Sequence, residues 1–203
     1  ASFNISGNTL RTSESFNYEV KSSYSIRIRT TDAGGLTYEG TFIINVTNVN
    51  ETPTNINLSA SSISENVPIN TVVGTLSSTD VDSGDTFTYS LVSTLSYPDN
   101  NNFNISGNSL RSSITFDYEN NAPQSLRIRT TDAGGLYYDR TFTVYITNVT
   151  VTVTASSTTN VTCYGGSDGV ITVSNTTGGT AAYTYSKDGT NYQAGTTFSN
   201  LTA

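Results

Sequence analysis

The acidic side chains of this 203-residue sequence lie mainly at turns and junctions. Asp80-Val-Asp82-Ser-Gly-Asp85 is a turn with three carboxylates, and Asp117-Tyr-Glu119 is a second spaced pair. Residues i and i+2 of an extended segment point to the same side, and turn backbone leaves carbonyl oxygens free. Together these groups form the flexible oxygen shell that Ca²⁺ binds with about 6–8 ligands, whereas Mg²⁺ prefers a tighter octahedron. The pattern therefore predicts Ca²⁺ binding.

A plainer interpretation of the same residues stays open. Asp, Asn and Gly are ordinary turn residues, and an acidic β-protein carries some of them in its loops without any metal. Further acidic or amide motifs stand at Glu65-Asn66, at Asp132 before Ala-Gly-Gly, and along Asn48-Val-Asn50-Glu51. We expect a metal site only where several of these motifs meet.

The composition excludes several other kinds of site and partner. With no His and one Cys, the chain cannot assemble a classical zinc site or a His-based catalytic triad. Nine Lys plus Arg against 16 Asp plus Glu give a net charge of −7, too few cations for a dense basic face. We therefore expect no nucleic-acid partner. No apolar run approaches the roughly 20 residues that span a bilayer, so we expect no membrane insertion.

The elements that must position the acidic groups are short β-strands. Apolar residues alternate with polar ones in four runs bounded by turn signals. These residues are Ile56 and Leu58; Phe87, Tyr89 and Leu91; Leu126 and Ile128; and Phe142, Val144 and Ile146. Thr, Val, Ile, Tyr and Phe are abundant, which favours an all-β fold. We expect about seven antiparallel strands in two packed sheets, an Ig-like β-sandwich, with Arg127 and Arg129 facing water.

An internal repeat sets the predicted domain organisation. Residues 3–50 align without gaps on residues 103–150, and 29 of the 48 positions are identical at an offset of 100. One complete repeat then runs over residues 51–149, preceded over residues 1–50 by the second half of an earlier repeat. We therefore expect the chain to be an excerpt of a longer protein.

From about Thr150 the sequence changes character. Cys163-Tyr-Gly-Gly-Ser-Asp-Gly169 precedes an apolar run, Gly178-Gly179 breaks the pattern, and Lys187-Asp-Gly189 predicts a tight hairpin turn. Residues 150–203 are predicted to be a partial β module of a different type.

The complete repeat resembles the cadherin repeat. Glu65-Asn66 looks like that family's Glu-Asn element, Asp80-Val-Asp82 its D-x-D, and Asp117-Tyr-Glu119 its D-R-E. In the same order, Asp132-Ala-Gly-Gly resembles the D-x-G turn, and the segment from Asn48 to Pro53 resembles the D-x-N-D-N-x-P linker. The resemblance implies tandem cadherin-like sandwiches in an elongated rod, with Ca²⁺ bound between successive repeats.

The resemblance also implies two sets of ligands. At the first junction these are Glu19, Asn50, Glu51, Asp80, Asp82 and Asp132. Asn17, Asn48 and Glu51 replace Asp residues of the family pattern, which implies fewer or weaker ions. At the second junction the ligands are Glu65, Asp117, Glu119 and Asn148, and the third module has no D-x-D to complete them. We expect a half-site or a direct packing contact there.

The third module resembles the SprB repeat of gliding-motility adhesins, through Cys163-Tyr-Gly-Gly-Ser-Asp-Gly, Gly178-Gly179 and Tyr183-Thr-Tyr185. That family usually carries a second Cys, so the resemblance implies a disulfide partner for Cys163 beyond residue 203. The alternative is a buried, unpaired thiol that packs as a small apolar residue.

Two functions from different classes follow. The first is a non-catalytic stalk segment of a long, secreted, multi-repeat cell-surface adhesin of Bacteroidetes-type bacteria, serving cell adhesion with a link to gliding motility. Its partners would be neighbouring repeats of the same chain and other surface, secretion or motility proteins. The alternative is a glycan-, ice- or protein-binding β-sandwich module of an adhesin or of an extracellular enzyme, with Tyr137, Tyr138 and Tyr145 as the platform. Paired carboxylates could also do acid–base work, but no pocket context supports an enzyme.

Overall fold

The structure of the chain is a computed structural model that describes residues 2–92, 95–179 and 182–202. Contacts divide the chain into two compact units. The first unit comprises residues 1–58, 76–92 and 128–140, and the second comprises residues 59–75, 93–127 and 141–203. Strands make up nearly all regular structure, as the composition predicts. Among the described residues, no helix has the length and apolar character needed to cross a bilayer.

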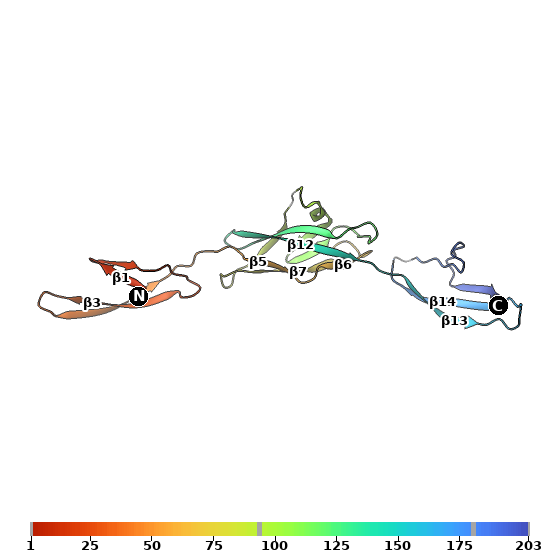
Figure 1. Cartoon of the computed structure of the whole chain (residues 1–203), viewed down its shortest axis with the longest axis horizontal. Helices are drawn as coiled ribbons and strands as arrows, with labels where there is room; N and C mark the ends of the chain where they lie inside the picture. The colour runs from red at the N-terminus through yellow and green to blue at the C-terminus, as the bar shows by residue number, and fades with distance from the viewer. Residues whose placement is uncertain (1, 93–94, 180–181, 203) are drawn as a thin grey trace. The chain divides into compact units, whose positions relative to one another are not determined.

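Residues 3–45 form two antiparallel hairpins (Figure 1). In the shorter one, β1 (Phe3–Ser6) pairs with β2 (Thr9–Thr12), with Ile5 opposite Leu10. In the longer one, β3 (Ser23–Thr31) pairs with β4 (Thr37–Asn45) over nine residue pairs. In β1 and β3 the apolar residues stand at alternate positions, which is the period of a sheet with one apolar face, whereas in β4 Phe42, Ile43 and Ile44 follow one another.

Two four-stranded sheets build the predicted β-sandwich repeat. The first sheet has the order β5 (Asn55–Leu58), β7 (Val72–Thr79), β10 (Ser109–Ser112), β9 (Phe103–Ser106). The second has the order β6 (Ser62–Ser64), β12 (Tyr137–Thr147), β11 (Gln124–Thr131), β8 (Thr88–Leu91). A 3-10 turn, η1 (Pro98–Asn102), precedes β9. The all-β sandwich is confirmed, and its described residues contain eight strands where the sequence predicts about seven.

One strand pairing differs from the antiparallel prediction. β6 runs parallel to β12, with Tyr145 opposite Ser62 and Thr147 opposite Ser64. The backbone N–H of Tyr145 donates to the Ser61 carbonyl at 2.9 Å, and that of Glu65 donates to the Thr147 carbonyl at 3.0 Å. The three-residue β6 carries too few residues for its alternation to predict either its existence or its direction.

The predicted apolar runs supply only part of the core, because Leu58, Phe142 and the whole run of Phe87, Tyr89 and Leu91 are half-buried. Buried apolar side chains come from both sheets and from the loop before Asp117; they are Ile56, Ile63, Val73, Leu76, Phe103, Leu110, Phe116, Leu126, Ile128, Val144 and Ile146. β11 alternates strictly between buried and half-buried residues. The expectation that Arg127 and Arg129 face water is therefore only partly right, because both are half-buried. Arg129 donates to Asp139 at 2.7 and 3.0 Å, which offsets the cost of burying its charge.

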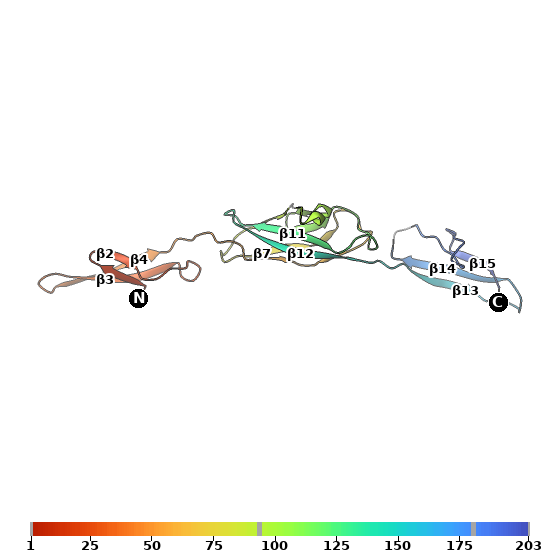
Figure 2. The ribbon, with the colours of Figure 1, turned by 45° about the horizontal axis from the view of Figure 1, so that its top comes forward.

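The third module is a three-stranded antiparallel sheet, β13 (Thr152–Thr159), β14 (Gly169–Thr177) and β15 (Thr197–Leu201), shown side by side in Figure 2. The chain bends at residues 187–190, but the flanking bridge leaves residues 186–192 between its partners, so the loop is wider than the predicted tight hairpin turn. Asp188 Oδ1 accepts from the backbone N–H groups of Thr190 and Asn191 at 2.9 and 2.8 Å. In the described part of this module, an isolated bridge joins Tyr185 and Gln193 on either side of the loop.

Cys163 is exposed, and no disulfide involves it among the described residues. The alternative in which this thiol packs as a buried apolar residue is therefore wrong. A disulfide partner outside the 203 residues stays a prediction.

Candidate metal centre

The acidic loop of the first unit connects the end of β7 at Thr79 to the start of β8 at Thr88. The backbone N–H of Asp82 donates to Asp80 Oδ1 at 3.2 Å, an Asx-type contact that closes the first bend. Gly84 has a φ of +89°, a conformation that glycine adopts without strain and that reverses the chain before Asp85. The loop thus holds three carboxylates within six residues.

The first acidic group joins three segments. Glu19, Glu51 and Asp82 each offer an oxygen atom, and these atoms lie within 4.8 Å of one another. Asp82 accepts from the Asn48 amide at 2.7 Å and from the Glu51 backbone N–H at 2.9 Å. The Glu51 N–H, followed by the Asn48 amide, lowers the pKa of Asp82. Partial burial, then the charges of Glu19 and Asp82, raise the pKa of Glu51.

The second acidic group comprises Asp80, Asp85 and Asp132, whose nearest oxygen atoms also lie within 4.8 Å of one another. Asp132 is buried, accepting from the Leu136 N–H at 2.8 Å and from the Asn50 amide at 3.0 Å. Burial raises the pKa of Asp85, and the charges of Asp132, Asp80 and Asp82 raise it further. The fold therefore holds three like charges together, and no Lys or Arg side chain forms a salt bridge with them among the described residues.

Three carboxylate oxygens of these groups are buried and have no hydrogen-bond partner among the described residues: Glu51 Oε2, Asp80 Oδ2 and Asp85 Oδ2. Leaving such an atom unpaired costs stability, and a cluster of them indicates a missing ligand. A donor set of carboxylate and amide oxygens without thiolate or imidazole suits a hard cation with many ligands. The residues present therefore fit Ca²⁺, as the sequence predicts.

Gly134 makes room for the linker. A Cβ at this position would lie 2.4 Å from Cγ of Asn50, whereas one at the equivalent Gly34 would lie no closer than 3.4 Å to Asp32 Oδ1. We expect Gly134→Ala to displace the Asn50 amide from Asp132 and to destabilise the chain by ~1–3 kcal/mol, as overpacking does.

The matched substitution Gly34→Ala should be neutral or slightly stabilising, because Ala restricts the unfolded chain. Urea unfolding of both variants measures the difference. Equal urea midpoints for the two variants would show that Asn50 can move away from residue 134 without loss of stability.

The third acidic group lies in the second unit. Oxygen atoms of Glu65, Asp117 and Glu119 lie within 4.8 Å of one another. Glu65 is buried and already accepts from the backbone N–H groups of Tyr118 and Val149 at 3.1 and 2.7 Å. The Asn148 amide donates to Glu119 at 3.0 Å. Asn120 is the main group that lowers the pKa of Asp117, so this group is better satisfied by the protein itself than the other two.

The structure divides the predicted first-junction set in two. Glu19, Glu51 and Asp82 form one group, and Asp80 and Asp132 belong to the other, with Asn50 bonded to Asp132. The set predicted for the second junction comes together: Glu65, Asp117 and Glu119, with Asn148 on Glu119. That any of these residues binds a metal stays a prediction.

Asp85 is the residue that the ligand prediction omits. It stands in the same turn as Asp80 and Asp82, so the acidic spacing of that turn contains the signal. The family pattern does not include it, because a D-x-D motif ends at its second Asp.

Asp85→Asn is expected to act in opposite directions with and without metal. In EGTA the substitution removes a charge that burial and three neighbouring carboxylates disfavour, so the melting temperature should rise. In Ca²⁺ it removes a charged oxygen, so affinity should fall by at least about tenfold, the range seen when partners of a metal site are removed.

Calorimetric titration and thermal melts of the same variant give the two readouts. Asp99, outside the three groups, gives the control substitution Asp99→Asn. If Asp85→Asn raised both the melting temperature in EGTA and the affinity for Ca²⁺, or lowered both, Asp85 would not be a Ca²⁺ ligand.

Acidification in EGTA should first stabilise the chain. Glu51 and Asp85 have raised pKa values when folded, so their stabilising contribution is complete below their ordinary values of 4.5 and 3.8 and is lost as pH rises through the folded values. Asp82 and Asp117 have lowered pKa values, so their contribution is lost as pH falls below 3.8. The melting temperature should therefore rise from pH 7 toward about 4.5 and fall below about 3.8. Glu51→Gln should flatten the rise; an unchanged profile in that variant would rule out Glu51 as its source.

Comparison with known proteins agrees with both resemblances, to the SprB repeat and to the cadherin repeat. Residues 155–190 match the profile of the SprB repeat family. Similarity to solved structures shows the fold. Human protocadherin-24 EC1-2 has a TM-score of 0.59 and 20% identity over 72% of this chain and 76% of its own. The chain combines cadherin-like repeats with a SprB-type repeat.

This chain is also similar to two protocadherin structures that are longer than it. PcdhgB3 EC1-4 has a TM-score of 0.58 and 24% identity over 71% of this chain. The protocadherin GammaB4 extracellular domain has a TM-score of 0.57 and 19% identity over 100% of this chain. The chain spans 36% and 37% of the lengths of these two structures.

Proposed function

We propose that this chain is a non-catalytic stalk segment of a multi-repeat, extracellular cell-surface adhesin, and that Ca²⁺ stiffens the link between its first two repeats. The observation that carries the proposal is the set of unpartnered, buried carboxylate oxygens on Glu51, Asp80 and Asp85 among the described residues. The cadherin-like fold and the SprB-type repeat support an adhesin-type repeat protein. Adhesion, with a link to gliding motility, is the role proposed for the parent protein.

The positions of three carboxylates support an effect of the ion on stiffness. Glu19 belongs to the predicted first repeat, Glu51 to the linker and Asp82 to the loop after β7. A cation bound to all three would tie the linker to a segment on each side of it. Without the ion the same carboxylates repel one another and favour a bent or open linker. Ca²⁺ binding would therefore restrict bending of the linker.

Small-angle scattering of the full chain in Ca²⁺ and in EGTA tests this function. We expect a smaller spread of molecular dimensions in Ca²⁺ and a broader one in EGTA. Glu51→Gln combined with Asp82→Asn should remove the difference, while Glu14→Gln, an exposed acidic residue outside the groups, should keep it. A native chain that binds Ca²⁺ but scatters identically in both conditions would leave a metal site without a stiffening role, and one that binds no Ca²⁺ would remove the proposal.

A ligand-binding module is the alternative, and one observation bears on its tyrosine platform. Tyr137 and Tyr145 are exposed, with 52% and 54% of their surfaces accessible. The Arg129 guanidinium lies 3.6 Å from the centre of the Tyr137 ring and is held there by Asp139. One face of that ring is thus already stacked, which favours a structural cation–π contact over a sugar platform. A glycan-array or ice-affinity signal lost in Tyr145→Ala would favour the alternative.

A further inference from the structure

The complete repeat carries a pocket of about 690 Å³, lined by residues 118–123 of one loop and by Tyr145 and Ile146 of β12. Its volume falls in the range of small-molecule sites, about 300–1,000 Å³. Two of the lining side chains are exposed aromatic rings, Tyr118 and Tyr145, with 47% and 54% of their surfaces accessible. The pocket therefore presents two rings to solvent around one hollow.

Neither ring has a partner that explains its position. In the described part of the chain, no ring contact, cation–π contact or hydroxyl hydrogen bond involves Tyr118 or Tyr145. By contrast, the hydroxyl groups of Tyr89 and Tyr97 have partners at 3.1 and 3.2 Å, and the Tyr137 ring is stacked on a guanidinium. The two pocket tyrosines thus keep their faces and their hydroxyls available to a ligand.

The loop that carries Tyr118 is fixed by its own hydrogen bonds. The Asp117 carbonyl accepts from the N–H groups of Asn120 and Asn121 at 3.2 and 2.8 Å. The Asp117 carboxylate accepts from the Asn120 amide at 2.6 Å, and the Asp117 N–H donates to the Asn121 side-chain oxygen at 2.8 Å. These bonds leave the Asn121 amide donors and the Asn120 side-chain oxygen without partners among the described residues. A donor and an acceptor are therefore held beside the rings before any ligand binds, which lowers the entropy lost on binding.

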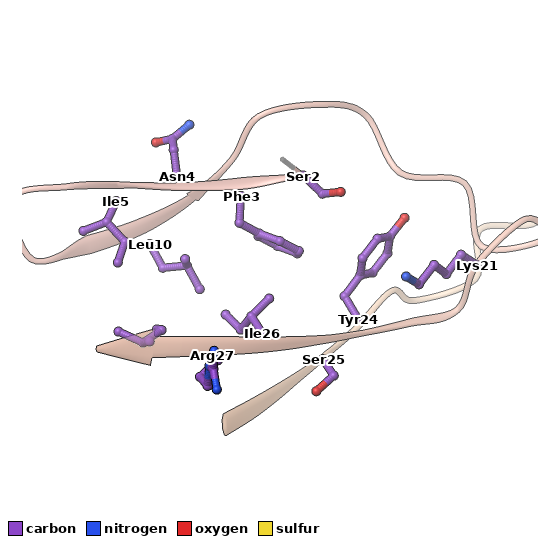
Figure 3. Close-up of a pocket in the computed structure, with 11 residues that line it drawn as sticks. Ser2, Phe3, Asn4, Ile5, Leu10, Lys21, Tyr24, Ser25, Ile26 and Arg27 are labelled. Carbon is purple, nitrogen blue, oxygen red and sulfur yellow. The ribbon is translucent and has the colours of Figure 1, made fainter. Parts of the chain in front are cut away.

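The first copy of the repeat shows that the shared fold does not require this lining. Three lining positions carry other residues there: Val20 for Asn120, Lys21 for Asn121 and Asn45 for Tyr145. Figure 3 shows Lys21 beside Tyr24, and the Lys21 ammonium lies 4.2 Å from the centre of that ring. Phe3 and Phe16 also pack on Tyr24. That tyrosine is covered by protein groups, whereas Tyr118 and Tyr145 are open.

We propose that the pocket beside Tyr118 and Tyr145 binds a neutral saccharide. The C–H face of a sugar ring is apolar and packs on an aromatic ring, while sugar hydroxyls both donate and accept hydrogen bonds. The Asn121 amide donates to such hydroxyls, and the Asn120 oxygen accepts from them. This site does not rest on the stiffening of the first linker by Ca²⁺, so either proposal can fail without the other.

The charges around the pocket exclude an acidic sugar. Glu119 lines the pocket, and oxygen atoms of Glu65 and Asp117 lie within 4.8 Å of one of its own. None of the described residues that line the pocket is Lys or Arg. An anionic ligand would be repelled by these carboxylates, whereas a neutral one would not.

The sheet beside the pocket argues against an extended peptide as the ligand. At Tyr145, β12 lies between β11 and β6, and its backbone N–H already donates to the Ser61 carbonyl. A peptide strand therefore finds no free backbone edge to join there. Recognition has to come from side chains, which suits a ligand that presents many hydroxyl groups.

An NMR titration of the full chain tests the site. The probes are short neutral oligosaccharides of glucose, mannose, xylose and galactose, with a galacturonate oligomer of equal length as the anionic control. We expect at least one neutral probe to shift the amide resonances of residues 118–123 and 145, while those of residues 18–23 and 45 stay unchanged. Tyr145→Asn and, separately, Tyr118→Ala should weaken binding at least about tenfold, as loss of an aromatic anchor does. Tyr137→Asn, outside the pocket, should bind like the native chain.

The melting temperatures of these variants separate loss of binding from loss of fold. Both pocket tyrosines are exposed, so their substitution should leave the melting temperature nearly unchanged. The proposal is overturned if no neutral probe shifts the pocket amides, or if the galacturonate oligomer binds as tightly as a neutral one. Binding that survives Tyr145→Asn but disappears in EGTA would place the sugar on a metal ion and would also overturn it. A polyproline peptide that shifts the same amides while every sugar fails would assign the pocket to a peptide instead.

Discussion

Removal of Ca²⁺ with EGTA is expected to lower the melting temperature of the full chain by on the order of 10 °C, measured against Ca²⁺ at about 100 times its Kd. A ligand at that excess stabilises the native state by ~2.7 kcal/mol. For a domain of about 100 residues each kcal/mol moves the melting temperature by ~4–8 °C. The stabilisation arises where Glu51, Asp80 and Asp85 gain a cation for oxygens that otherwise have no partner among the described residues.

Two controls separate metal binding from general ionic effects. Mg²⁺ at the same concentration should restore little of the loss, because the loop supplies more oxygens and a less regular shell than Mg²⁺ prefers. In Asp80→Asn combined with Asp85→Asn, EGTA should change the melting temperature by much less than in the native chain. A native melting temperature that is the same in Ca²⁺ and in EGTA contradicts the candidate centre.

Leu110→Ala should destabilise the complete repeat by ~2–5 kcal/mol, whereas the equivalent change Leu10→Ala should cost less than about 1 kcal/mol. The reason is burial: Leu110 of β10 lies between β9 and β7 and is 0% exposed, whereas Leu10 of β2, which pairs with β1 among the described strands, is 36% exposed. Truncating Leu110 leaves a cavity, while truncating Leu10 removes contacts that water already reaches. Urea unfolding, followed by Tyr fluorescence, gives both values.

Each variant is a control for the other, because the sequences around the two leucines are nearly identical. Residues 3–13 and 103–113 differ only at Thr9 and Thr12, which are Ser109 and Ser112 in the second copy. Comparable losses at Leu10 and Leu110 would contradict the difference in burial between the two side chains.

The fold was predictable because the alternation of apolar and polar residues along a strand can be read from a short stretch of sequence. Leu126, Ile128 and Val144 alternate with polar residues and are buried, as expected from a strand with one apolar face. The offset of 100 predicted equivalent hairpins, and β1–β2 and β9–β10 do have the same register, with Ile5 opposite Leu10 and Ile105 opposite Leu110. The spacing of the acidic residues indicated the loop that holds Asp80 and Asp82.

What could not be predicted depends on contacts between distant residues. The direction of β6 is decided by its pairing with β12, more than 80 residues away, and its three residues carry no directional signal. The division of the carboxylates into two groups depends on how the Asn50 amide reaches Asp132, for which Gly134 must lack a side chain. Arg129 was expected in water because its neighbours alternate, but Asp139 and Tyr137 lie within its reach.

The parallel pairing of β6 with β12 has a mechanical consequence. In a stalk, tension applied beyond Thr147 would pull along β12 and across the bonds from Tyr145 to Ser61 and from Glu65 to Thr147. Bonds loaded in this way share the force and must break together, whereas a hairpin pulled from its open end separates one pair at a time. Glu65 adds a carboxylate contact to Val149 just beyond the last bonded pair, at 2.7 Å. If the chain is a stalk, its shortest sandwich strand would therefore resist shear at the point where the chain leaves the repeat.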